Sequence, residues 1–203
     1  MDFPVSIHTE KLKNTPVQAT VYYPVVTGIA NEEAQLKINR AIVTLLNKML
    51  IDQNYYEPSL VELLANFEIK NNQRGILSLN LIVYSFTGGA HGMTAVKSLT
   101  FDVKTGHSFT LQELFKPNSD YVKEISAIIT EDIKKWQVDI INPFTKISPD
   151  QDFYIADTSL VIYFQLYDIT PYYWGFPYFP IAILNLQDLI KQNGPLDKMM
   201  SFT

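Results

Sequence analysis

The chain of 203 residues contains no cysteine. This absence excludes disulfide bonds, thiolate nucleophiles, cysteine-ligated zinc sites and iron–sulfur clusters. Histidine is scarce as well, because only His8, His91 and His107 occur, and none of them forms the His-x-x-x-His spacing of a helical metal site. We therefore expect neither a cofactor nor a metal ion.

Clusters of basic residues and long apolar runs are also missing. The 16 Lys and Arg against 21 Asp and Glu give a net charge of −5, and the densest basic pair is Lys134-Lys135. We therefore predict no nucleic acid partner, since phosphate binding needs a basic surface. No run of about 18 apolar residues is present, which argues against a transmembrane segment.

The first residues of the sequence show neither the basic nor the apolar region of a signal peptide. Taken as complete, the sequence therefore indicates a cytoplasmic protein. A protein whose leader has been removed would give the same pattern.

Apolar and aromatic residues, in contrast, are plentiful. Hydrophobic residues make up 47% of the chain and aromatic residues 13%, with 12 Tyr, 12 Phe and 2 Trp. A chain of this length buries most of its apolar surface in one domain or in two small halves that share a core. So much aromatic area predicts either a large core or a binding surface.

Two nine-residue segments, 84–92 and 167–175, resemble each other. Each begins with Tyr, has Thr at its fourth position and ends with Gly, and the offset between them is 83 residues. Both follow a run of alternating apolar residues that is typical of a strand. The repetition predicts two related half-domains, each with one special loop after a strand.

Apolar periodicity and turn residues predict the same element order in both halves. The first half has predicted strands at 5–12 and 17–23, a helix from Asn31 to about Gln53, and strands at 63–70 and 76–87. The second has predicted strands at 94–103 and 107–110, a helix from about 118 to 136, and strands at 153–156 and 160–166. We therefore predict an α+β fold of two ββαββ half-domains, residues 1–92 and 93–203, each with one long helix packed on an antiparallel sheet.

Several segments resemble the extracytoplasmic domain of RsiV-type anti-sigma factors. They are Thr-Gly-Gly-Ala-His-Gly at 87–92, Leu-Thr-Phe-Asp-Val-Lys-Thr-Gly at 99–106, Leu-Gln-Glu-Leu-Phe at 111–115, and Tyr-Asp-Ile-Thr-Pro-Tyr at 167–172 with the Gly175 and Pro177 that follow. The N-terminal half, with Tyr23-Pro24-Val25 and the helix that contains Ile38-Asn39, resembles the companion domain that commonly precedes it. Similar domains accompany PdaC-type peptidoglycan deacetylases.

The resemblance implies a binding domain, because RsiV binds lysozyme through its exterior domain. This sequence shows no transmembrane helix, no cytoplasmic sigma-binding segment and no cleavage region, so anti-sigma activity is not carried over. The resemblance implies a non-catalytic recognition domain that binds a lysozyme-like protein or a cell-wall glycan. The alternative is an enzyme or an accessory domain in peptidoglycan modification.

The glycine-rich segment contains the first group of candidate site residues, Gly88, Gly89, His91 and Gly92. The glycines allow close approach of a ligand, but they lack the spacing of a phosphate-binding loop. His91 either hydrogen-bonds the loop backbone or Asp168, or acts with Asp168 as an acid–base pair. No Gly-x-Ser-x-Gly motif accompanies them, so we predict no catalytic residue and no enzyme.

The aromatic segment 172–180 contains the second group, namely Tyr172, Tyr173, Trp174, Phe176 and Tyr178. Its prolines and glycine argue against a regular central strand. Rigid loops rich in Tyr and Trp are good recognition surfaces, although the same rings could instead fill the core. We predict that this loop, Asp168 and the glycine-rich loop form one ligand-binding patch.

Overall fold

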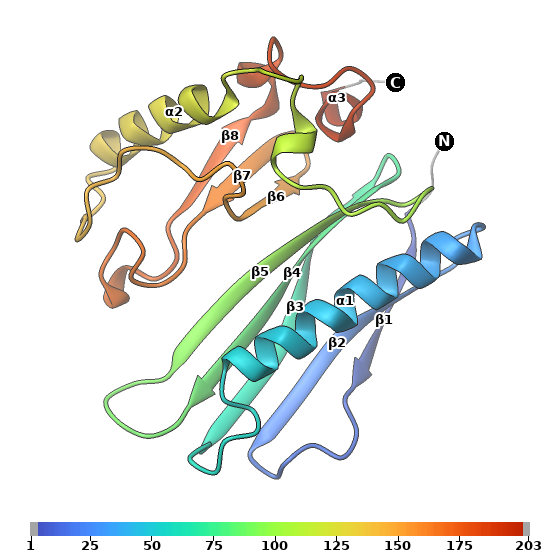
Figure 1. Cartoon of the computed structure of the whole chain (residues 1–203), viewed down its shortest axis with the longest axis vertical. Helices are drawn as coiled ribbons and strands as arrows, with labels where there is room; N and C mark the ends of the chain where they lie inside the picture. The colour runs from blue at the N-terminus through green and yellow to red at the C-terminus, as the bar shows by residue number, and fades with distance from the viewer. Residues whose placement is uncertain (1–3, 201–203) are drawn as a thin grey trace. The chain divides into compact units, whose positions relative to one another are not determined.

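The computed structural model describes residues 4–200 and divides the chain into two compact units between Ser108 and Phe109 (Figure 1). The first unit contains β1 (Ser6–Lys11), β2 (Ala19–Thr27), α1 (Glu32–Asp52), β3 (Glu62–Gln73), β4 (Ile76–Phe86) and β5 (Met93–Asp102). The second contains the short 3-10 helix η1 (Gln112–Leu114), α2 (Tyr121–Lys135), β6 (Phe153–Ala156), β7 (Ser159–Tyr163), η2 (Tyr172–Trp174), β8 (Tyr178–Ala182), η3 (Ile183–Leu186) and α3 (Pro195–Met200). The predicted α+β class is confirmed.

The sheet of the first unit has the order β1-β2-β3-β4-β5 and is mixed rather than antiparallel. Strands β2 and β3 pair in parallel, from Ala19 with Leu63 onward, whereas the other neighbours are antiparallel. The reason is that α1 lies between β2 and β3 in the chain, and a helical connection returns the chain to the same end of the sheet. The predicted antiparallel sheet is corrected in this respect.

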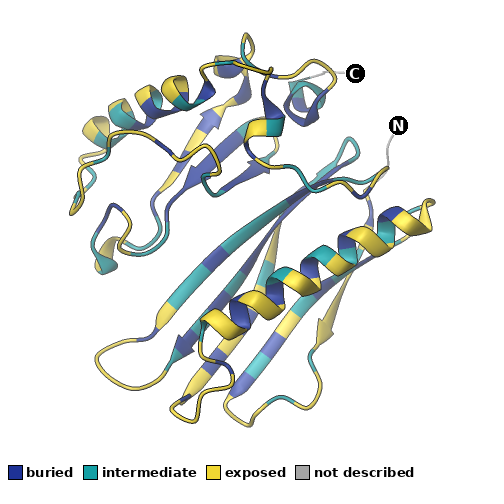
Figure 2. Cartoon of the chain, viewed as in Figure 1, coloured by how far each residue is buried: buried dark blue, intermediate teal, exposed yellow. Residues whose placement is uncertain are grey.

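Helix α1 packs one face onto this sheet, as its 3.6-residue periodicity predicts. Figure 2 shows buried positions recurring along the helix, with exposed positions between them. Its buried residues are Ala34, Ile38, Ile42, Leu46, Met49 and Leu50. Together with sheet residues such as Leu63, Leu79 and Phe101, most of them form the core of the first unit.

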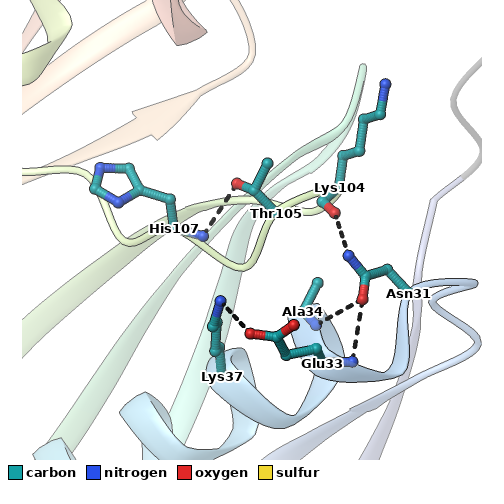
Figure 3. A network of polar contacts seen from close by, with 7 residues as sticks. All are labelled: Asn31, Glu33, Ala34, Lys37, Lys104, Thr105 and His107. Carbon is teal, nitrogen blue, oxygen red and sulfur yellow. Dashed lines mark hydrogen bonds and ion pairs between the residues drawn. The ribbon is translucent and has the colours of Figure 1, made fainter.

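The start of α1 is fixed by Asn31, its N-cap residue. Its Oδ1 accepts hydrogen bonds from the backbone N–H groups of Glu33 (3.1 Å) and Ala34 (3.2 Å), which have no partner within the helix. Its Nδ2 donates to the carbonyl oxygen of Lys104 at 3.2 Å, so the same side chain joins the helix to the turn after β5 (Figure 3). The cap therefore has a tertiary role as well as a local one.

Strand β5 belongs to the first unit, which corrects the predicted ββαββ halves. It pairs antiparallel with β4, from Ser85 with Met93 to Ile76 with Asp102, and places Phe101 in the core. The predicted strand at 107–110 is reduced to a single bridge between Phe101 and Ser108. The division between the units therefore lies later in the chain than the predicted boundary after Gly92.

The second unit contains an antiparallel three-stranded sheet with the order β6-β7-β8. Its buried side chains include Leu160, Ile162 and Tyr163 of β7 and Phe179 and Ile181 of β8. Strand β8 includes Pro180 and lies at the edge of the sheet, where proline is tolerated. Within residues 4–200, no helix is both long and apolar enough to span a membrane.

Each unit contains a helix followed by three antiparallel strands in consecutive order. In the first unit this series is α1, β3, β4 and β5, and in the second it is α2, β6, β7 and β8. The two similar sequence segments therefore occupy equivalent places, between the second and third strands of each series. The repeated topology is αβββ, because the strands that precede α1 have no counterpart before α2.

Candidate functional site

The glycine-rich segment forms the loop of the β4–β5 hairpin. The last strand pair before it is Ser85 with Met93, and residues 87–91 are exposed. A methyl group added at Gly88 or Gly89 would meet no atom within 4 Å. The tip of this loop is therefore open to a ligand.

At the base of the same loop, Gly92 and His91 each have a structural role. Gly92 is buried, and a methyl group added there would lie 2.3 Å from Cε2 of the Tyr84 ring. Nδ1 of His91 donates to the carbonyl oxygen of Gly92 at 3.0 Å, and the imidazole is exposed. The expectation that His91 hydrogen-bonds the loop backbone is confirmed.

We expect Gly92→Ala to destabilise the first unit by about 1–3 kcal/mol, because the added methyl group displaces the Tyr84 ring. Urea unfolding followed by circular dichroism measures this change. In a Tyr84→Ala background the same substitution is expected to cost less than half as much. An undiminished cost in that background would show that the Tyr84 ring is not the obstacle.

The second segment begins with a tight turn after β7. Oδ2 of Asp168 accepts from the backbone N–H of Gln165 at 2.9 Å, and the N–H of Asp168 donates to the carbonyl oxygen of Gln165 at 3.2 Å. Tyr167, between them, has a φ of +68°, an uncommon conformation for a bulky residue. Asp168 thus holds the turn that leads into the aromatic segment.

A neighbouring segment, 139–142, holds this loop in place. Nδ2 of Asn142 donates to the carbonyl oxygens of Tyr167 (3.3 Å) and Asp168 (3.0 Å), and the N–H of Ile141 donates to the carbonyl oxygen of Ile169 at 3.0 Å. The hydroxyl group of Tyr173 donates to Oδ2 of Asp139. Hydrogen bonding to this carboxylate, followed by desolvation and repulsion from the same charge, raises the pKa of Tyr173.

The aromatic rings divide into an exposed and a buried group. Tyr173 and Trp174, both on η2, are 74% and 39% exposed. Phe179 is 1% exposed and stacks against Trp136, with ring centroids 5.7 Å apart. Both interpretations of the segment therefore hold for different rings, because β8 begins within it and turns alternate side chains inward.

The remaining predicted rings are supported by other rings. Tyr172 packs against Tyr167 at a centroid distance of 5.8 Å, and Phe176 packs against Tyr178 at 6.3 Å. Tyr178 also meets Tyr163 at 5.5 Å. Phe176, Tyr178 and Tyr163 thus connect the end of the loop to the core of the second unit, whereas Tyr172 and Tyr167 pack on each other within the loop.

The predicted site residues thus belong to different compact units. Gly88, Gly89, His91 and Gly92 lie in the first, and Asp168 and the aromatic residues lie in the second. The predicted single patch and the acid–base pair of His91 with Asp168 stay predictions. Within residues 4–200, no three His, Cys, Asp or Glu side chains converge as a metal site would require.

Sequence reasoning did not identify Asp139 and Asn142, although both contact the aromatic loop. The Asn142-Pro143 pair locally indicates only a break in regular structure, and Asp139 has no local pattern around it. Their contacts join residues 25 to 34 positions apart in the chain, which no local motif encodes.

Comparison with family models assigns both halves of the chain. Residues 10–94 match the model described as "Deacetylase PdaC", and residues 112–183 match the "Protein of unknown function (DUF3298)". The chain joins a PdaC-like domain to a DUF3298 domain. The glycine-rich loop lies in the PdaC-like domain, the aromatic loop lies in the DUF3298 domain, and the turn at 102–106 lies between the two matches.

Two curated relatives, both from Bacillus subtilis, confirm the resemblance drawn from the motifs. Anti-sigma-V factor RsiV is 29% identical over 183 residues, which cover 82% of this chain and 63% of RsiV. Peptidoglycan-N-acetylmuramic acid deacetylase PdaC is 24% identical over 139 residues, which cover 64% of this chain and 30% of PdaC. The chain therefore spans less than two thirds of each relative.

Two crystal structures of DUF3298 proteins share the fold. A protein from Bacteroides fragilis has a TM-score of 0.71 at 14% sequence identity and covers 97% of both chains. A protein from Pseudomonas aeruginosa PAO1 has a TM-score of 0.63 at 17% identity and covers 95% of this chain and 96% of its own. At these identities the similarity establishes the fold only.

Proposed function

We propose that this chain is a non-catalytic recognition module that binds a cell-wall-related ligand, either a lysozyme-like protein or a glycan. The binding surface is the aromatic loop of the DUF3298 domain, residues 167–178. The observation that carries the proposal is the exposed pair Tyr173 and Trp174 on a turn that hydrogen bonds hold. Large rings fixed in place offer contact area at little entropic cost.

The choice of ligand class is supported by the relatives. RsiV is named as an anti-sigma-V factor, and PdaC is named for its action on peptidoglycan. Lysozyme as a ligand comes from the resemblance to the exterior domain of RsiV-type anti-sigma factors. A ligand of this kind lies outside the cytoplasmic membrane, so a cell-envelope location is part of the proposal.

The distribution of charge is consistent with a basic protein or an uncharged glycan. The second unit, residues 109–203, contains the DUF3298 match and carries 12 Asp and Glu against 7 Lys and Arg. This difference equals the whole net charge of −5. Such a surface repels polyanions and attracts basic partners.

The rival function, an enzyme in peptidoglycan modification, depends on His91. In the first unit, Nδ1 of His91 donates to the carbonyl oxygen of Gly92, a structural role that requires no catalytic chemistry. We therefore propose that no residue is catalytic. If the rival function holds, wild-type protein turns over wall fragments and His91→Ala abolishes that turnover.

We expect Trp174→Ala to weaken binding of lysozyme or of soluble peptidoglycan fragments at least tenfold, since exposed Trp residues at interface centres are typical hot spots. Isothermal titration calorimetry measures the affinities. Tyr56→Ala is the matched control, because Tyr56 is 75% exposed but lies in the first unit. Absence of heat with every ligand, or equal losses in both variants, would contradict the proposal.

A further inference from the structure

We propose that Tyr173 and Trp174 form a stacking platform for an uncharged sugar chain that carries N-acetyl groups. The inference rests on the proposed function, because it names the ligand class for the same aromatic loop. It follows from ring contacts, unpaired polar atoms, the rigidity of the turn and the charge of the domain.

Ring contacts single out these two side chains. The other exposed or half-exposed rings from Trp136 to Tyr178 each pack against another ring. In the described part of the chain, Tyr173 and Trp174 have no ring partner, although both are exposed and adjacent. Sugar rings stack on such faces through their apolar C–H groups, which suits two rings that the fold itself leaves uncovered.

The polar atoms beside the rings match an acetamido group. Among the residues that the structure describes, the indole N–H of Trp174 has no hydrogen-bond acceptor. Asp139 uses Oδ2 to accept from the Tyr173 hydroxyl group, and its Oδ1 has no donor within the same residues. An acetamido group carries one carbonyl acceptor and one N–H donor, so the donor of Trp174 and the acceptor of Asp139 match the two polar atoms of such a group in chemical type.

The turn that carries the platform is fixed at both ends. The N–H of Trp174 donates to the carbonyl oxygen of Pro171 at 3.0 Å, and the N–H of Gly175 donates to that of Tyr172 at 3.1 Å. Tyr173 is held by Asp139 and the start of the loop is held by Asn142. Because the rings are already positioned, little ordering entropy is lost on binding.

The negative charge of the second unit favours uncharged over anionic cell-wall polymers as ligands. The carboxylates of Asp139 and Asp168 belong to the loop and its support, and the surrounding unit is acidic. An anionic polymer is repelled by these groups, whereas an uncharged N-acetylated chain is not. Carboxylates also accept well from hydroxyl and amide donors.

The test is a calorimetric titration of the whole chain with the tetramer of N-acetylglucosamine, and with cellotetraose, which lacks the acetamido groups. We expect saturable binding of the N-acetylated tetramer and at least tenfold weaker binding of cellotetraose. Trp174→Ala is expected to weaken the first interaction at least tenfold. Trp174→Phe, which keeps a ring but removes the N–H, is expected to retain an intermediate affinity. Circular dichroism shows whether each variant is folded.

The outcomes separate this inference from the proposed function. Binding of lysozyme that depends on Trp174, without binding of the tetramer, overturns the sugar platform and leaves the recognition function in place. Binding of the tetramer that Trp174→Phe and Trp174→Ala leave unchanged also overturns it. Failure of the sugars, wall fragments and lysozyme alike overturns both.

Discussion

Gly106→Ala is expected to destabilise the first unit by about 2–4 kcal/mol. Gly106 has a φ of +73°, which side-chain-bearing residues adopt only with strain. A methyl group at this position would lie 2.7 Å from the carbonyl oxygen of Ala34 and 2.9 Å from its Cα. Both atoms belong to the backbone of α1, so the helix itself must move. Urea unfolding monitored by circular dichroism measures the loss.

Gly28→Ala is the matched control for this substitution. Gly28 has a φ of +78°, but the nearest atom to an added methyl group is Oγ of Ser6 at 3.7 Å, an ordinary contact. It therefore reports the backbone strain alone, about 1–2 kcal/mol. Equal losses at the two positions would show that the contact between Gly106 and α1 contributes nothing.

The Asp-x-x-Thr-Gly motif at 102–106 gains a structural role from this contact. Oδ1 of Asp102 accepts from the backbone N–H of Thr105 at 2.9 Å and from its hydroxyl group at 3.1 Å, which shapes the turn. Gly106 then lies against Ala34, and Lys104 accepts from Asn31. The motif therefore anchors the end of β5 to the start of α1.

A fragment of residues 1–108 is expected to fold cooperatively, whereas a fragment of residues 1–92 is expected to remain unfolded or to aggregate. The shorter fragment lacks β5 and with it the buried side chains of Val96 and Phe101. Loss of a buried Phe side chain alone costs about 3–5 kcal/mol, which approaches the whole stability of a small domain. It also leaves β4 with an unpaired edge.

Circular dichroism, thermal unfolding and size-exclusion chromatography distinguish the two fragments. Phe101→Ala in the 1–108 fragment provides a milder version of the same change, with an expected loss of about 3–5 kcal/mol. Cooperative unfolding of the 1–92 fragment would place the boundary before β5 after all.

Local patterns predicted the elements whose stability depends on nearby residues. The apolar stripe gave α1 almost to the residue, and Asn31 caps it because its side chain reaches N–H groups two and three positions away. The similarity of segments 84–92 and 167–175 correctly located two loops with equivalent positions in their units.

The pairing of strands in the sheets was predicted less well than the strands and helices themselves. The pattern at 94–103 correctly indicated a strand, but it contains nothing that distinguishes β4 from a later strand as its neighbour. The partner was decided by the hairpin at 87–92 and by burial of Phe101 beside α1. Sheet type followed in the same way, since α1 imposes the parallel pairing of β2 and β3.

The candidate site, too, was predicted in part from the sequence and decided in part by the tertiary structure. Composition identified the aromatic segment, because so many rings interrupted by proline and glycine suit neither a regular strand nor a helix. Which rings are exposed depended on β8 and on the contact of Trp136 with Phe179. The supports Asp139 and Asn142 come from a separate segment and became visible only in three dimensions.

The sequence by itself determined the α+β class, both long helices, the two loops and the resemblance to RsiV-type and PdaC-type domains. Each of these depends on interactions within a few residues or on motif identity. Only the tertiary structure decided the sheet that includes β5, the division at Ser108 and the exposure of Tyr173 and Trp174. These features depend on which segments, far apart in the sequence, pack together and exclude water from their apolar surfaces. A local sequence pattern does not specify those packing partners.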